Sequence, residues 1–383
     1  MRKHLTAEQK EIEQIIKKLC EDTLNQNVFL EDDKCIFNHE KWDSLGKTGI
    51  FALPFDEQYG GLNADMKTTA HAIKSLGKYS KDEGIVFSAC AQIAAIQVPI
   101  WLYGTEEQKE TFLMPLMTGE KIGASVISEP EAGSDLSQLK TRVEKENDTF
   151  RLNGVKTFAT LAPEADVLLV YGRHANGLRM LDISAFLLEK GEYKIGQIFE
   201  KAGLRTSPMS EVILENVQLP MKRLLGTERK GMEIFMKAMI WEKILVSAYH
   251  VGVMEQQFSQ VYAYSCSRKQ FNHRIIEFDS IAKRLTDMRM RIETSRLMLF
   301  DVCEQYDEGK IESSLSAMVK LHTSEAKLKN SLDAIHIMGA YGIIKENMVE
   351  KQMRDALAAN IYSGTSDMQR KILFDKLGDL SEE

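Results

Sequence analysis

Apolar residues at helical spacing dominate the first 120 positions of the chain. The segment LTAEQKEIEQIIKKLCEDTL places its isoleucines and Leu19 on one face, and Thr6 and Gln9 have the spacing of a capping box. The segments ADMKTTAHAIKSLGKYS and IVFSACAQIAAIQVPIWLYG predict two further helices, the second buried on most sides. We therefore expect an N-terminal helical domain over residues 1–122.

Beyond this point the pattern changes to short alternating or fully apolar runs separated by turn residues. In DTFRLNGVKTFAT, the pair Asn153-Gly154 stands between two alternating runs, which predicts a β-hairpin turn. DVLLVYGR, DISAFLLEK and SEVILENVQLP are typical of further strands. The sequence predicts a middle β-domain, a barrel or sandwich, over residues 123–232.

The helical period returns after GTERKGMEIF and continues almost to the end of the chain. The helical segments are long enough for an antiparallel four-helix bundle, which we expect over residues 233–383. The predicted fold class is thus α+β and multidomain, with helices on both sides of the β-domain in the sequence.

Composition narrows the classes of function. The chain has 383 residues, of which 44% are hydrophobic, and its net charge is −7 without a lysine-rich run, so no basic surface for nucleic acid is expected. The five cysteines are far apart, odd in number and without a CxxC pair, which favours reduced thiols over disulfides or a metal site. Because the start of the chain is polar, we expect neither a signal peptide nor a membrane span, and a cytoplasmic location.

One acidic residue interrupts an apolar helical face. In AMIWEKILVSAY, Glu242 is in helical register with five apolar or aromatic residues, Ala238, Met239, Leu245, Val246 and Tyr249. A carboxylate in an apolar stripe is costly unless it has a partner or a task. By pattern alone, an ion pair with another helix and a catalytic role are equally supported.

Ordered motifs along nearly the whole chain resemble those of acyl-CoA dehydrogenases. They are LPFDEQYGGLNADM, YGTEEQKETFLMPLMTGEKIGAS, ISEPEAGSDLSQLKT, LNGVKTFAT, RKQFNHRI and MRDALAANIYSGTSDMQ. The resemblance implies FAD as cofactor and an acyl thioester on CoA or a carrier protein as substrate. It also implies a homotetramer, a dimer of dimers, with an electron-transfer flavoprotein or O2 as electron acceptor.

The resemblance also implies three groups of FAD contacts. The first comes from the β-domain: Ser125, Ile127, Ser128, Gly133, Ser134, Phe158 and Thr160. The second is expected to reach the FAD of a neighbouring subunit: Arg268, Gln270, Phe271, His336 and Gly339. The third lies near the C-terminus: Ser363, Gly364, Thr365 and Ser366. Phe158 stands where the family usually has tryptophan, and Asp279, where it usually has glutamine, would repel a pyrophosphate.

The family's usual base is absent from the segment IYSGTSDMQR. Most members carry a glutamate just before the glycine, where this chain has Ser363, whereas a minority branch carries it on the helix of Glu242, one residue before a basic residue. The resemblance therefore implies Glu242 as the base, with a pKa that burial should raise. Ser363 should offer only its backbone N–H to the thioester carbonyl. Ser134 and Lys243 should contact the pantetheine arm or a phosphate, with a solvated lysine as the alternative for Lys243.

The substrate remains open at this point. Departures such as Phe158, Asp279, His336 and Ser363 favour a specialised member, with a slight preference for an acyl or aminoacyl group, such as prolyl, on a carrier protein. A short or branched acyl-CoA is the alternative. Two other classes are a non-catalytic assembly or nucleic-acid-binding protein, which Ser363 would favour, and a flavin-dependent oxygenase.

Overall fold

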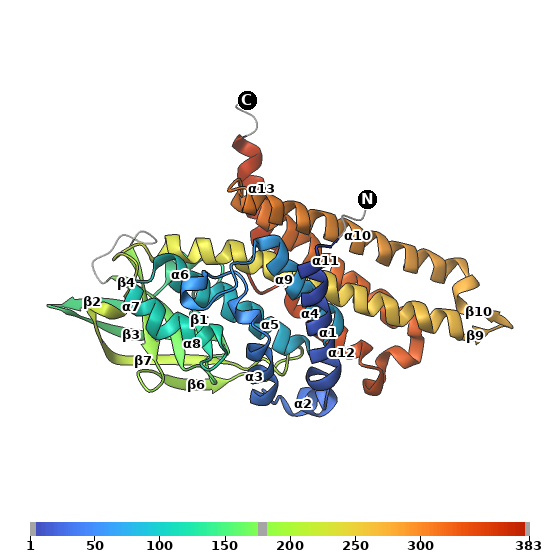
Figure 1. Cartoon of the computed structure of the whole chain (residues 1–383), viewed down its shortest axis with the longest axis horizontal. Coiled ribbons are helices and arrows are strands. Elements are labelled where there is room, and N and C mark those ends of the chain that lie inside the picture. The colour runs from blue at the N-terminus through green and yellow to red at the C-terminus, as the bar shows by residue number, and fades with distance from the viewer. Residues whose placement is uncertain (1–4, 175–181, 380–383) are drawn as a thin grey trace.

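The computed structural model describes residues 5–174 and 182–379. The chain forms an N-terminal group of helices, a β-sheet and a long helical bundle, in that order (Figure 1). The sheet occupies one end of the molecule together with the last of the N-terminal helices, the longest helix runs from it to the opposite end, and the first N-terminal helices lie across the middle. The predicted α+β fold class with three parts is confirmed.

The N-terminal helices begin at residues suited to capping. At α1 (Ala7–Leu19), the Thr6 hydroxyl accepts from the N–H of Gln9 and the Gln9 side chain accepts from the N–H of Thr6, so the predicted capping box is confirmed. α4 (Met66–Tyr79) begins after Asp65, whose carboxylate caps it. The other helices of this part are α2 (Val28–Lys34), α3 (His39–Lys47), α5 (Glu83–Ala91), α6 (Val98–Tyr103), α7 (Glu106–Gln108) and α8 (Met114–Met117).

One apolar helical run corrects an expectation from the sequence. α5, a π-helical segment and α6 form the continuous run Glu83–Tyr103, which by length and composition is able to cross a membrane, although no such segment was expected. Of its most apolar stretch, 78% is buried inside the protein. A core helix passes the same test of length and composition, and the predicted burial of this segment is confirmed.

The middle part is one connected sheet. Its strands are β1 (Gly123–Val126), β2 (Arg142–Glu146), β3 (Thr149–Thr160), β4 (Val167–His174), β5 (Ile183–Glu189), β6 (Lys194–Ile198), β7 (Met209–Pro220) and β8 (Leu224–Leu225). Their order along the sheet is β6-β7-β3-β2-β4-β5-β8, and β1 pairs in parallel with β4. Most side chains of β4 are buried, as expected for a strand covered on both faces.

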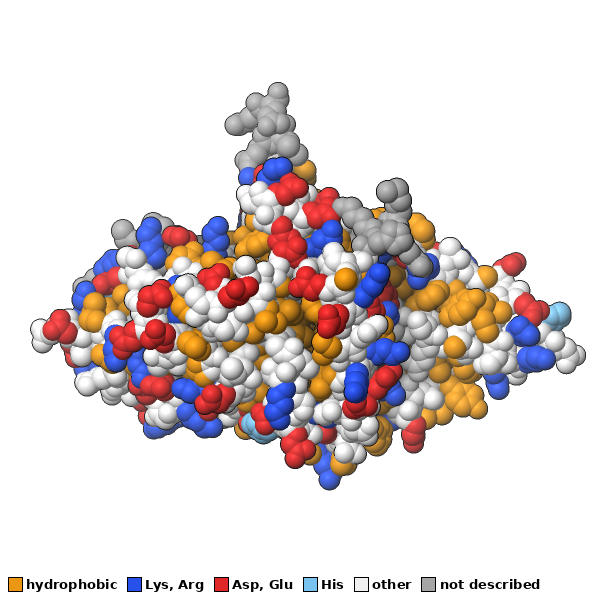
Figure 2. Space-filling model, viewed as in Figure 1, with side chains coloured by type: hydrophobic (Ala, Val, Ile, Leu, Met, Phe, Trp, Pro, Cys, Tyr) orange, Lys and Arg blue, Asp and Glu red, His pale blue; other side chains and the backbone are white. Residues whose placement is uncertain are grey.

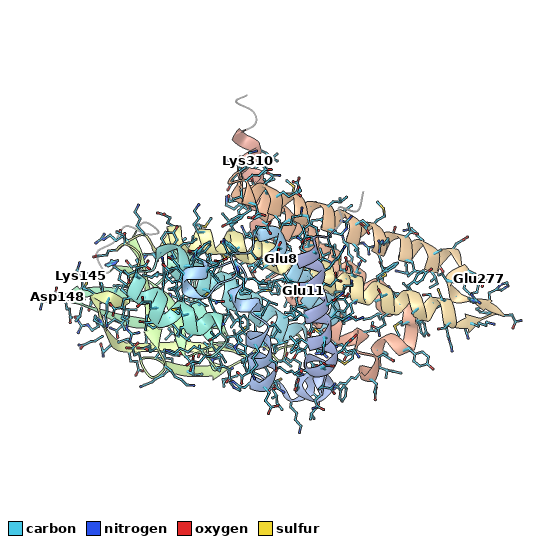
Figure 3. All side chains as sticks on the ribbon, viewed as in Figure 1. Glu8, Glu11, Lys145, Asp148, Glu277 and Lys310 are labelled. Carbon is cyan, nitrogen blue, oxygen red and sulfur yellow. The ribbon has the colours of Figure 1, made fainter. Side chains whose placement is uncertain are left out.

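The hairpin turn predicted at Asn153-Gly154 is wrong. Both residues lie inside β3, where the register with β7 shifts between Leu152 and Gly154 as a β-bulge. The turn lies instead at Asn147 and Asp148, with Asn147 in the left-handed region at φ 53°, and Figure 3 labels Asp148 at this tip of the sheet. Pairing on both sides of β3, with β2 and with β7, keeps the Asn-Gly pair extended.

The C-terminal part is built around one very long helix. α9 (Gly231–Ser267) has 37 residues and packs against α4 as well as α11 (Ser313–Met338). α10 (Asp279–Asp307), α12 (Val349–Ala359) and α13 (Ser366–Asp379) complete this part, and the small hairpin of β9 (Lys269–Gln270) and β10 (His273–Arg274) joins α9 to α10. α9 therefore connects the sheet with the far end of the molecule.

Two hydrophobic clusters stabilise this arrangement. The larger one runs through the N-terminal helices, the sheet and the first part of α9. The smaller one lies at the far end of the bundle and includes Val261, Leu285 and Met288. Figure 2 shows further apolar side chains gathered on the visible face over this end of the bundle, where they are not covered by the chain itself.

Candidate active site

Glu242 lies in the first half of α9 and meets the C-terminal segment of the chain. Its neighbours Trp241 and Lys243 are buried, whereas part of the Glu242 side chain remains accessible. The hydroxyl of Ser363 donates to Glu242 Oε1 at 2.7 Å. Glu242, the expected base, is therefore in direct contact with Ser363, the residue at the position where the usual base is absent.

The surroundings of Glu242 favour its protonated form. Burial raises the pKa of its carboxyl above the usual value, while the hydrogen bond from Ser363 and the charges of Lys320 and Lys243 act in the opposite direction. Across residues 5–174 and 182–379, no lysine or arginine forms an ion pair with Glu242. The alternative of an ion pair with another helix is therefore not realised, and a raised pKa makes this carboxylate a stronger base.

Two buried amines lie beside the carboxylate. Lys243 is 3% exposed, so the alternative of a solvated lysine is wrong, and burial lowers its pKa to about 8. Lys320, on α11, is fully buried, and burial lowers its pKa to about 7. The Lys320 amine donates to the carbonyl of Gly364 at 2.7 Å. Both amines therefore have pKa values near neutral pH, and their charges act on the base.

The turn that carries Ser363 has a defined backbone. Ser363 has φ 56° and Gly364 has φ 80°, both in the left-handed region. Gln369 donates through Nε2 to the carbonyls of Ser363 and Gly364 at 3.1 and 2.9 Å. In the part of the chain that the structure describes, the N–H of Ser363 has no acceptor. This N–H is therefore available to a ligand, as the predicted role in polarising a thioester requires.

The other C-terminal candidates make local contacts. Thr365 accepts from the N–H of Met368 and is thereby placed at the start of α13, while the Ser366 hydroxyl donates to Asn360. Both are half-buried together with Gly364. These two hydroxyls therefore have partners within the chain. Their contacts with FAD stay a prediction.

The β-domain candidates gather where β1 and β3 end. The N–H of Thr157 donates to the carbonyl of Ser128 at 3.0 Å, which joins the end of β3 to the residues after β1. Phe158 is 61% exposed with φ 56°, and its ring packs on Phe199. Three residues with hydroxyl groups at the same place are half-buried: Ser125, Ser128 and Thr160. Ile127 is almost fully buried.

The loop that carries Gly133 and Ser134 is held at its two ends. Glu129 accepts from the N–H groups of Lys140 and Thr141 and from the buried amine of Lys156. Ser134 is exposed, and nothing lies within 4 Å of a Cβ placed on Gly133. The sequence did not predict the buried pair of Glu129 and Lys156, since the two residues are separated by a loop and a strand. A ligand can approach the backbone at Gly133 without hindrance.

The second group of candidates lies far from Glu242. Arg268 directly follows α9 and lies 26 positions after Glu242, or about 39 Å at the helical rise. At this end, Phe271 is 87% exposed, Arg268 lies over the ring of Tyr341, and Gln270 and Phe271 line an open groove. His336 and Gly339 are exposed where α11 ends. Figure 3 labels Glu277 beside the same hairpin. Within one chain, the length of α9 keeps this group away from Glu242.

The residues fit FAD in two separate places. An isoalloxazine ring requires apolar surface and hydrogen-bond donors, and the ends of β1 and β3 supply exposed Phe158 with three hydroxyls beside it. A pyrophosphate requires a cation and open backbone, and the far end supplies Arg268, which forms no ion pair among the described residues, and Gly339, around which a Cβ would meet nothing. The exposed Asp279 begins α10 near this groove.

A buried polar network behind the turn was not predicted. The Tyr362 hydroxyl contacts the Tyr249 hydroxyl and lies 2.5 Å from Nε2 of His250, whose pKa burial lowers far below the usual value. The fully buried Lys327 pairs with Glu83 of α5 and lies over the Tyr249 ring. The helical spacing gave Tyr249 only a place on the apolar stripe, because its polar partners, Tyr362 of the C-terminal turn and Lys327 of α11, come from other segments of the chain.

Comparisons with known proteins agree over the whole chain. Three family models match it: Acyl-CoA dehydrogenase, N-terminal domain, over residues 6–120; middle domain, over 124–217; and C-terminal domain, over 229–378. The L-prolyl-[peptidyl-carrier protein] dehydrogenase of Serratia sp. is 33% identical over 377 residues, which cover 98% of both chains. The short-chain-specific acyl-CoA dehydrogenase of Clostridium acetobutylicum is 31% identical over 376 residues, 98% of this chain and 99% of that one. The solved structure of PigA with FAD and proline superposes with a TM-score of 0.96 at 33% identity, covering 99% of each chain.

Proposed function

The chain belongs to the acyl-CoA dehydrogenase family, and from this we propose that it catalyses FAD-dependent α,β-dehydrogenation of an acyl thioester. One observation carries the proposal. Glu242, whose pKa burial raises, meets the turn of Ser363, whose N–H is free to bind a carbonyl oxygen. A base beside an oxyanion donor is what removal of a proton α to a thioester requires.

The chain's residues divide this task among themselves. The N–H of Ser363 donates to the thioester carbonyl oxygen and so acidifies the α-carbon. Glu242 takes the α-proton, and its partly accessible side chain can receive a substrate from outside. The buried, apolar residues of α5 and α9 around the carboxylate raise its pKa and so make it a stronger base. FAD, when bound, supplies the acceptor for the hydride from the β-carbon.

For the substrate, we prefer an acyl or aminoacyl group, such as prolyl, on a carrier protein. The support is the Serratia relative, whose name states a prolyl group on a peptidyl-carrier protein, and the PigA structure with FAD and proline. A short or branched acyl-CoA is the second candidate, supported by the Clostridium relative at nearly the same identity. The predicted contacts of Ser134 and of buried Lys243 with the pantetheine arm suit both, because carrier-bound and CoA thioesters share that arm.

The assembly and the location form part of the proposal. A homotetramer, as a dimer of dimers, would bring the far-end group of one chain to the FAD of another, and the separation of about 39 Å along α9 within one chain supports this proposal. The five cysteines are all free, which suits the proposed reducing cytoplasm. The electron acceptor is an electron-transfer flavoprotein or O2, and reoxidation of the reduced protein by air or by the flavoprotein distinguishes the two.

The decisive experiment compares tethered and free thioesters. Purified protein should be yellow with one FAD per chain, and its flavin should bleach anaerobically when an acyl- or prolyl-loaded carrier protein is added. The matching acyl-CoA should bleach it much more slowly, because a carrier adds contacts beyond the pantetheine arm. Rapid bleaching by butyryl- or isovaleryl-CoA would favour the second candidate. A colourless protein that cannot be reconstituted with FAD would instead point to a non-catalytic relative.

A further inference from the structure

We propose that Ser363 is a positioning residue for Glu242, with its hydroxyl holding the carboxylate oxygen Oε1 so that Oε2 remains free for the proton. This inference deepens the proposed function and rests on it. Sequence reasoning expected only a backbone role for Ser363, so the side-chain contact is a correction. The hydroxyl that replaces the family's usual glutamate thus remains part of the active site.

The position of this hydroxyl is set before any substrate binds. Ser363 is 8% exposed, and its carbonyl and that of Gly364 are both held by Gln369, itself 1% exposed. The amine of Lys320 fixes the Gly364 carbonyl a second time. Because three donated hydrogen bonds secure two successive carbonyls, the Ser363 side chain is directed at Glu242 by the backbone of the turn and requires no induced movement.

The other titratable groups around Glu242 do not make this contact. The titratable or charged groups that face it are Lys243 on α9, Lys320 on α11, Cys90 on α5 and Tyr171 on β4. The Lys320 amine donates to the Gly364 carbonyl and the Cys90 thiol to the Leu245 carbonyl, and among the described residues no hydrogen bond joins Lys243 or Tyr171 to Glu242. Among the residues that the structure describes, Ser363 is the direct hydrogen-bond donor to the carboxylate.

The contact has a consequence for proton affinity. A hydroxyl that donates to a carboxylate stabilises the ionised form, so the Ser363 hydrogen bond lowers the pKa of Glu242 against the effect of burial. Without the hydroxyl, Glu242 should hold its proton to higher pH. A smaller fraction of the base is then available at a given acidic pH, even though each ionised carboxylate is at least as basic.

The first test is the pH dependence of flavin reduction in single turnovers. Ser363→Ala should move the acid limb to higher pH, so that the rate at a pH on the wild-type limb falls about tenfold while the alkaline plateau is retained. Ser363→Gly, which suits the positive φ, should shift it equally, and Ser363→Cys, a weaker donor of similar shape, should shift it less. Ser265→Ala removes a buried hydroxyl from α9, 23 residues after Glu242, and should leave the pH profile unchanged.

The second test does not depend on turnover. The infrared carboxyl band of Glu242, assigned by its loss in Glu242→Gln, can be titrated in substrate-free protein. In Ser363→Ala and Ser363→Gly, the band of the protonated acid should persist to higher pH than in the wild type. Identical titrations overturn the inference even if the flavin still bleaches. A displaced titration in a protein that no thioester bleaches supports the hydrogen-bond role and rejects the proposed function.

Discussion

The two ends of α9 carry candidate residues of opposite character. Near its start, Glu242 is in contact with Ser363, the Gly364 carbonyl is held by buried Lys320, and the neighbouring amines have lowered pKa values. Near its end, Arg268 and Phe271 are exposed around an open groove. The proposed base and its contacts therefore come from one chain, whereas the far region has an open groove, which suits the proposal that a second chain completes it.

Replacing the base should give the largest effect. Glu242→Gln keeps the size of the side chain and can still accept from Ser363, but it cannot take a proton. We expect flavin reduction by the substrate to fall by roughly 10²- to 10⁴-fold, with FAD content unchanged because the far region is untouched. Stopped-flow absorbance of the oxidised flavin measures both quantities. A wild-type rate would mean that another group is the base.

Buried and exposed ion pairs should differ in their contribution to stability. Lys327 and Glu83 are 0% and 3% exposed at the side chain, whereas Lys283 and Asp287 on α10 are 76% and 41% exposed. Lys327→Met leaves a buried carboxylate unpaired and should lower the free energy of unfolding by about 3 kcal/mol. Lys283→Met should lower it by less than about 0.5 kcal/mol. Denaturant unfolding at equal protein and FAD concentrations checks this contrast, and equal losses would show that protonation of Glu83 relieves the unpaired charge.

At the far end, the expected effect is on cofactor retention. Arg268→Ala removes the cation predicted to pair with pyrophosphate and should weaken FAD binding by about 1.5–3 kcal/mol, roughly 10- to 100-fold. Lys269→Ala removes an adjacent exposed cation and serves as the matched control. FAD release followed by fluorescence during dilution provides the measurement. If both variants lose FAD equally, general electrostatic attraction accounts for the effect and the specific contact of Arg268 is not supported.

Helical and strand periodicity predicted the fold because the spacing of apolar residues is a local property, which the sequence shows directly. The capping box at Thr6, the long bundle helices and the apolar stripe around Glu242 all follow from spacing alone. The Asn153-Gly154 turn was wrong because pairing with two other strands outweighed a local preference. Burial of Lys243 and the hydroxyl contact of Ser363 could not be predicted, since both depend on which segments pack together across the fold.

The smallest effect concerns Asp279, where two electrostatic contributions oppose each other. Asp279 is the first residue of α10, and a carboxylate there stabilises the helix by about 0.3–1 kcal/mol through the helix dipole. The same carboxylate, near the groove lined by Gln270 and Phe271, is predicted to repel a pyrophosphate.

Asp279→Asn should therefore lower the free energy of unfolding slightly while it strengthens FAD retention by less than Arg268→Ala weakens it. The gain in retention should vanish at high salt, because exposed charges are screened there. Asp301→Asn, further along α10, should change neither quantity. A loss of stability without any gain in retention at low salt would place Asp279 away from the phosphate, and Arg268 would then act without an opposing charge.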